Sequence, residues 1–105
     1  MRLTTHQING IISAIHTYLN QYPVELRLYG SRVHDHLKGG DIDLLLILQT
    51  EEQKIAASDV KHKILAEIKK NIGDQKIDLI ITSRHSLLQD AFIKMIFTTS
   101  VILQK

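Results

Sequence analysis

Two aspartates at the start of an apolar segment are the residues of this chain whose spacing best suits chemistry. Asp41 and Asp43 are separated by one residue and are followed by the apolar run 44–48. In a strand, residues two apart point to the same face, roughly 6.5–7 Å from each other. Two carboxylates that share a face repel each other unless a cation or a proton lies between them. The pattern therefore predicts a cation site at the mouth of a buried strand.

A third carboxylate, Asp78, also opens an apolar segment, at residues 76–82. If that segment is a strand beside the first one and in register with it, all three carboxylates converge. Magnesium binds through a few carboxylates together with waters and substrate phosphates, which suits an open site at a strand end. In a two-metal arrangement, Asp41 and Asp43 could bridge the ions. Asp78 could hold one ion and also take the proton of an acceptor hydroxyl.

Gly30 and Ser31 end another segment with the alternation of a strand, at residues 24–29. Ser31 can cap a short helix over about 32–37, and a helix start offers backbone N–H groups and a hydroxyl to an anion. Beside the carboxylates, these groups complete a site for a metal-bound phosphate.

These motifs match a known family. Gly30-Ser31, nine intervening residues, Asp41-x-Asp43 and the later Asp78 resemble the DNA polymerase beta-type nucleotidyltransferases, and the short chain looks like their minimal branch. The resemblance covers most of the chain, from the first predicted helix to the last strand. It implies transfer of a nucleoside monophosphate, first of all AMP from ATP, to an acceptor hydroxyl. It also implies that the three aspartates are catalytic residues and ligands of Mg²⁺, with two ions expected.

The nucleotide is expected to bind at Gly30, Ser31, Arg32 and His34. The family commonly reads Gly-Ser-Arg-Ala-Arg-Gly and has a Ser before the acidic pair, whereas this chain has His34 at the second arginine position and Gly40 in place of the Ser. A histidine with its ordinary pKa is only partly charged at neutral pH. These departures keep open a second reading, in which the chain is a binding module that neutralises a partner by contact alone.

The resemblance also implies a partner. The minimal branch is often paired with a HEPN-type protein as a toxin–antitoxin couple, and the nucleotidyltransferase can silence the toxin by adding AMP to it. A chain of 105 residues is too small to enclose both a nucleotide and an acceptor, so we expect a partner or an oligomer to complete the site. Transfer to a small molecule such as an aminoglycoside is a third reading, which the lack of a second domain disfavours.

The amino-acid composition limits the other classes of protein to which this chain could belong. The chain has 44% hydrophobic residues and no cysteine, which predicts one packed domain over 1–105 and excludes disulfides and thiolate metal sites. No signal-like or membrane-length apolar segment is seen, so the cytoplasm is the expected location. The net charge is only +2 and aromatics are 5%, so nucleic-acid binding is not expected from the lysines, which cluster between residues 61 and 76.

The periodicities predict an α/β (α+β) fold, a small mixed sheet of three to four strands packed with helices. A helix is expected over about 5–21 with Thr4 or Thr5 as its cap. The segment 41–48 should be a central strand covered on both faces. A capping box of Thr50 and Gln53 should open a long helix, broken near residue 58.

The last third of the chain is expected to form one more helix and a short strand. A second capping box, Ser86 with Gln89, should start a helix that runs to about residue 97. Its apolar residues, among them Phe92 and Met95, are interpreted as core. Residues 101–103 should add an edge strand.

Overall fold

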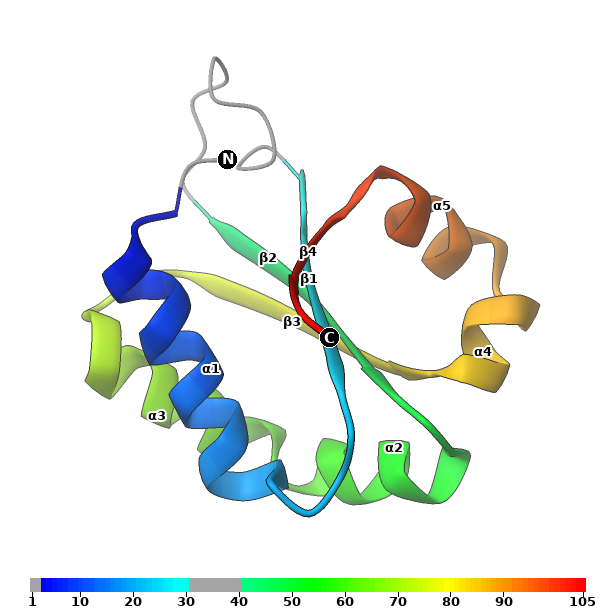
Figure 1. The fold of residues 1–105 in the computed structure, drawn as a ribbon, viewed down its shortest axis with the longest axis horizontal. Coiled ribbons are helices and arrows are strands. Elements are labelled where there is room, and N and C mark those ends of the chain that lie inside the picture. The colour runs from blue at the N-terminus through cyan, green and yellow to red at the C-terminus, as the bar shows by residue number, and fades with distance from the viewer. Residues whose placement is uncertain (1–2, 31–40) are drawn as a thin grey trace.

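The computed structural model describes residues 3–30 and 41–105. Its elements come in the order α1 (Thr5–Leu19), β1 (Glu25–Tyr29), β2 (Ile42–Leu48), α2 (Glu51–Asp59), α3 (Lys61–Ile72), β3 (Ile77–Ser83), α4 (Arg84–Gln89), α5 (Ala91–Thr99) and β4 (Val101–Gln104). Within the described ranges they form one mixed four-stranded sheet with helices on both faces (Figure 1). The predicted α/β (α+β) class is confirmed.

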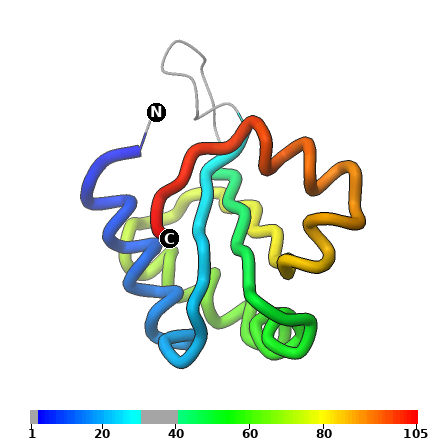
Figure 2. Tube along the Cα trace, turned by 45° about the vertical axis from the view of Figure 1, so that its right-hand side comes forward, coloured from blue at the N-terminus to red at the C-terminus, as the bar shows by residue number. Residues whose placement is uncertain are grey.

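The strands lie in the order β3-β2-β1-β4. β2 runs parallel to β3, whereas β1 is antiparallel to both of its neighbours, β2 and β4. The last strand accordingly lies alongside the first one (Figure 2). The parallel pair is joined through α2 and α3, because two parallel strands need a long crossover connection. As predicted, β2 is central.

Strand alternation divides the hydrophobic side chains between two cores. The larger core lies under α1 and α3 and contains Ile11, Ala14, Ile15, Leu19, Leu26, Leu28, Ile42, Leu44, Leu46, Leu48, Ala57, Ile64, Ile68 and Leu79. A smaller core on the opposite face contains Leu45, Ile47, Leu87 and Ile96, under α4 and α5. Figure 1 shows the two pairs of helices on opposite sides of the sheet. The odd-numbered side chains of β2 therefore face α4 and α5.

The predicted caps form at the starts of α1 and α2. Thr4 and Gln7 make a full capping box. Thr50 accepts a hydrogen bond from the N–H of Gln53, but the Gln53 side chain accepts from the N–H of Gln49 instead of Thr50. The expected break also occurs, since α2 ends at Asp59. Among the helices in the described ranges, none is both long and apolar enough to cross a membrane.

The predicted last helix is wrong in detail. Ser83, and not Ser86, caps α4, and Asp90 then ends α4 and caps α5 by accepting from two backbone N–H groups. Several apolar side chains of these two helices are exposed instead of core: Leu88 at 72%, Phe92 at 58% and Met95 at 59%.

Candidate active site

Two of the predicted carboxylates lie side by side on the sheet. Asp43 in β2 and Asp78 in β3 are direct partners in the parallel ladder. Neighbouring strands lie about 4.8 Å apart, so the two side chains start next to each other on one face. We call Asp43 and Asp78 the acidic pair. Asp43 is half-buried and Asp78 is exposed, so the pair opens toward solvent.

The face on which the acidic pair lies follows from the residues between and around it. Ile42 and Leu44 in β2 and Leu79 in β3 are buried in the larger core. A shift of one residue in the register would move every side chain of a strand to the other face. Such a shift would turn a carboxylate into the larger core, where an unpaired charge is costly. The hydrophobic pattern thus holds the acidic pair on the face of α4 and α5.

Gly30 lies beside the acidic pair, where β1 ends. Its φ of 79° is in the left-handed region, which favours glycine. A Cβ atom added there would collide with Oδ2 of Asp43. The Gly30 backbone therefore lies close to the carboxylate, and a side chain at this position would displace the carboxylate of Asp43. Gly30 and Asp43 are therefore neighbours in the structure, and the joint convergence of the three aspartates stays a prediction.

Tyr29 extends the row of the acidic pair onto a third strand. It is the antiparallel partner of Asp43, and its hydroxyl donates a hydrogen bond to Oδ2 of Asp78 at 3.2 Å. Burial of the ring raises the pKa of Tyr29 far above its ordinary value, and the charges of Asp78 and Asp43 and the hydrogen bond to Asp78 raise it further. The phenol is therefore a neutral donor at any physiological pH. The sequence analysis did not assign Tyr29 a role.

Asp41 lies just before β2, and its carboxylate points to a different partner. Its Oδ2 is 3.7 Å from Nζ of Lys76, the residue before β3. The two side chains are 43% and 80% exposed. An ion pair of such exposed groups contributes about 0–1 kcal/mol, so exchange of Lys76 for another cation is inexpensive.

The carboxylates of this site are ligands of the type that magnesium prefers, and two of the three predicted ligands lie next to each other. Among the described residues, no three His, Asp or Glu side chains are gathered closely enough to share one metal ion. The acidic pair alone, however, offers carboxylate oxygens from two adjacent strands in an open position. Magnesium is commonly bound by one or two carboxylates, with waters and substrate phosphates completing its octahedron. Asp43 and Asp78 could therefore hold the ion, whereas Asp41 lies two residues before Asp43 and pairs with Lys76.

The remaining predicted nucleotide-binding residues, Ser31, Arg32 and His34, lie outside the described residues. Their expected contacts with a triphosphate stay predictions. Gly30 is the member of that set that the structure describes, and it adjoins Asp43.

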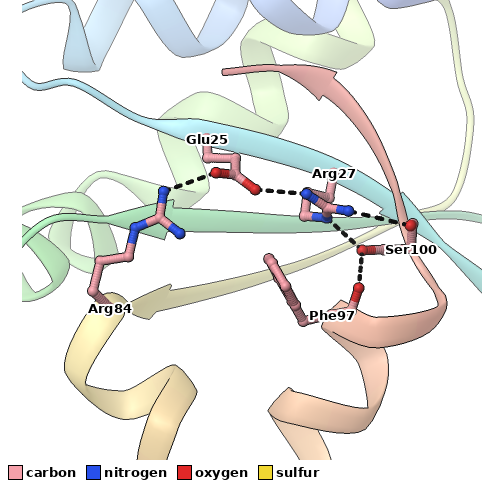
Figure 3. A network of polar contacts seen from close by, with 5 residues as sticks. All are labelled: Glu25, Arg27, Arg84, Phe97 and Ser100. Carbon is pink, nitrogen blue, oxygen red and sulfur yellow. Dashed lines mark hydrogen bonds and ion pairs between the residues drawn. The ribbon is translucent and has the colours of Figure 1, made fainter.

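A third carboxylate on the same face, Glu25, belongs to a polar network that was not predicted from the sequence (Figure 3). Glu25 accepts hydrogen bonds from Arg27 at 2.7 Å and from Arg84 at 2.8 Å. The Arg27 guanidinium also donates to the side chain and backbone oxygens of Ser100, and it lies 4.3 Å from the centre of the Phe97 ring. The network ties β1 to the start of α4 and to the turn between α5 and β4.

The network is structural in character. Glu25 is only 5% exposed. Its burial favours the protonated form, but the guanidiniums of Arg84 and Arg27 outweigh that effect and hold the pKa of Glu25 below its ordinary value. The alternation of Glu25 with Arg27 on one strand face was the available sequence signal. Alternation alone does not reveal that this face is covered, because the residues that cover it, Arg84 and Ser100, come from far along the chain.

Another polar cluster joins α2 to α4. The hydroxyls of Ser83 and Ser86 both donate to Oε1 of Glu51, and Nζ of Lys54 donates to the Ser86 hydroxyl at 3.3 Å. These hydrogen bonds, Ser83 first, lower the pKa of Glu51. A hollow of about 560 Å³ adjoins this cluster, lined by Lys54, Ile81, Thr82, Ser86, Gln89, Asp90, Ala91 and Ile93. The hollow lies near the end of β3 that is opposite to Asp78. Neither Asp43 nor Asp78 lines it.

Comparisons with known proteins give no relative from which a role could be carried over. No protein-family model matches this chain, and no curated protein matches it either.

Proposed function

We propose that the protein is a magnesium-dependent nucleotidyltransferase. It would transfer a nucleoside monophosphate, with AMP from ATP as the first candidate, to a hydroxyl of a macromolecular acceptor. The observation that carries the proposal is the in-register acidic pair of Asp43 and Asp78 beside the side-chain-free backbone of Gly30. The resemblance of the Gly-Ser and Asp-x-Asp motifs to the polymerase beta-type enzymes supports it.

In this reaction the acceptor oxygen attacks the α-phosphorus of the triphosphate. A bond forms between that oxygen and phosphorus, and the bond from the α-phosphorus to the bridging oxygen breaks, so pyrophosphate leaves with the electron pair. Asp78 takes the proton of the acceptor hydroxyl, since Asp78 is the more exposed member of the acidic pair. Bound Mg²⁺ supplies charge stabilisation for the attacking and leaving oxygens. Asp43 and Asp78, which are partners in the parallel ladder, would hold that ion.

The acceptor proposed here is a HEPN-type toxin encoded next to this protein, which makes the pair a cytoplasmic toxin–antitoxin couple. This step is supported by the resemblance alone. Small molecules are less suited as acceptors, because the acidic pair opens toward solvent at Asp78 and is not enclosed by the described residues.

The direct test is incubation of the protein with ATP, Mg²⁺ and the product of the adjacent gene, followed by intact mass measurement of that product. We expect the mass to rise by one or more AMP units with the wild type. The rise should be absent with Asp43→Asn and present with Asp74→Asn, a matched control that changes an exposed aspartate in the turn before β3. An acceptor that stays unmodified with every nucleoside triphosphate tested, or equal modification by Asp43→Asn, would refute the catalytic proposal.

The second candidate, a module that neutralises its partner by contact, is favoured by one observation. Leu88, Phe92 and Met95 expose large apolar side chains on α4 and α5. Exposed apolar clusters often mark protein interfaces. If this candidate holds, Asp43→Asn binds and neutralises the toxin as well as the wild type does, without any triphosphate. Loss of neutralisation in Asp43→Asn, with the complex still formed, would instead favour the enzyme.

A further inference from the structure

Tyr29 reaches across one strand to a carboxylate on the next. It lies on β1, Asp43 lies opposite it on β2, and Asp78 lies beyond on β3. Two strand spacings amount to about 9–10 Å, a span that only a long side chain with a terminal donor can bridge. The Tyr29 ring packs against the smaller core that contains Leu45 and Ile47, and this packing directs its hydroxyl along the row.

We infer that Tyr29 is the positioning residue for Asp78 in nucleotidyl transfer. Its hydroxyl holds Oδ2 of Asp78, which leaves Oδ1 as the oxygen presented to the cation and the acceptor hydroxyl. This inference rests on the proposed function and deepens it, because it assigns different tasks to the two oxygens of one carboxylate. A single fixed oxygen matters for chemistry, since a general base must lie within hydrogen-bond reach of its proton.

Burial explains why such a tether is useful at this position. Asp78 is exposed, and an exposed aspartate otherwise samples several side-chain rotamers. Tyr29 is half-buried and held by its ring, so it transfers the rigidity of the core to an exposed ligand. Residues that orient metal ligands from behind typically contribute about 10- to 100-fold to metal affinity or activity.

The test compares Tyr29→Phe with Tyr22→Phe, each in the full chain. Both changes remove one hydroxyl from a partly buried tyrosine, but Tyr22 packs against the larger core, away from the acidic pair. The first readout is Mn²⁺ affinity without nucleotide, measured by electron paramagnetic resonance. The second is the split of transfer kinetics into kcat and KM for ATP. The third repeats both measurements with Tyr29→Phe placed in an Asp78→Asn background.

We expect Tyr29→Phe to weaken Mn²⁺ binding and to lower kcat, each by about tenfold, while KM for ATP changes less than about twofold. Tyr22→Phe should match the wild type. In Asp78→Asn, Tyr29→Phe should add no further loss, because the hydroxyl acts through that carboxylate.

Three outcomes would overturn the inference: equal behaviour of Tyr29→Phe and Tyr22→Phe, an undiminished effect of Tyr29→Phe in Asp78→Asn, or a wild type that binds no Mn²⁺. The proposed function can fail separately. A wild type that binds Mn²⁺ through coupled Tyr29 and Asp78, yet transfers no nucleotide to any acceptor, would refute the enzyme while the positioning role of Tyr29 stands.

Discussion

Glu25 and Asp78 lie on the same face of the sheet and differ in nearly every other respect. Glu25 is 5% exposed and accepts hydrogen bonds from two guanidiniums, whereas Asp78 is exposed and accepts one from a neutral phenol. A buried carboxylate without a paired cation costs several kcal/mol, so Glu25 needs its arginines for the chain to fold. Asp78 instead has a second carboxylate, Asp43, as its neighbour in the ladder. Such a pair gains most from an external cation.

Carboxylates thus have two different roles on this face of the sheet. At one end of the face, charge is matched within the protein and the carboxylate ties elements together. At the other end, two carboxylates of like charge are kept in register by the hydrophobic residues of β2 and β3. A divalent cation bound between these two like charges would stabilise them.

The largest effect is expected from Glu25→Ala. Removal of the carboxylate leaves the Arg27 guanidinium partly buried without its partner, and breaking a buried pair costs about 3–5 kcal/mol. Urea denaturation should show that loss in the free energy of unfolding. Transfer activity per folded molecule should stay unchanged, since Glu25 does not contact the acidic pair. A loss below about 1 kcal/mol would show that the network is no structural tie.

The second largest effect is expected from Gly30→Ala. A Cβ at a left-handed φ costs about 1–2 kcal/mol, and it would also collide with Oδ2 of Asp43. We expect lower stability together with a loss of transfer of about tenfold or more. Gly73→Ala is the control, because Gly73 also has a positive φ, of 95°, but open space around it. If the two variants lose equal activity, displacement of Asp43 is not the cause.

Asp78→Asn should not lower the free energy of unfolding of the metal-free protein, in contrast to Glu25→Ala. It removes one of two like charges and keeps an oxygen that can accept from Tyr29, so the metal-free protein should be as stable as the wild type or up to about 1 kcal/mol more stable. Thermal unfolding with and without Mg²⁺ checks this. Added Mg²⁺ should raise Tm for the wild type and much less for the variant. Clear destabilisation of the metal-free variant would contradict the contrast with Glu25.

The pH dependence of stability should also follow Glu25. Its folded pKa is lowered from the ordinary value of 4.5, so its contribution is complete above that value and is lost as pH falls through the lower folded pKa. The difference in unfolding free energy between wild type and Glu25→Gln should therefore shrink on acidification below about pH 4.5. Glu51, whose pKa is also lowered, remains in both proteins and cancels. A difference that does not change with pH would refute this account.

The smallest effect is expected from Lys76→Ala. Its ion pair with Asp41 is long and exposed, so stability should change by less than about 1 kcal/mol. Mg²⁺ affinity should rise slightly, because Asp41 no longer has Lys76 as a competing partner. Calorimetric titration measures both the sign and the size, with Lys70→Ala as a control in an exposed lysine of α3. Weaker Mg²⁺ binding would show that Asp41 is not available to the cation.

Much of the acidic pair could be predicted because its signals are local. Alternation in 41–48 and 76–82 is enough to place Asp43 and Asp78 away from the larger core, and the apolar residues of β2 require cover on both faces. The caps at Thr4 and Thr50 likewise depend on residues three apart. Two local signals misled: Ser86 with Gln89, because Ser83 and Asp90 offered better caps nearby, and the apolar spacing of Phe92 and Met95, which are exposed.

The sequence by itself determined which segments form strands, which face of each carries the carboxylates and that Gly30 ends β1, since all of these depend on neighbours along the chain. Only the tertiary structure decided that β4 lies beside β1, that Arg84 and Ser100 enclose Glu25 and Arg27, that Lys76 meets Asp41 and that Tyr29 bridges to Asp78. These contacts join residues up to 78 positions apart, as in the pairing of Leu26 with Gln104. No periodicity encodes them, because they arise from the order in which strands pair and from the helices that cover the sheet.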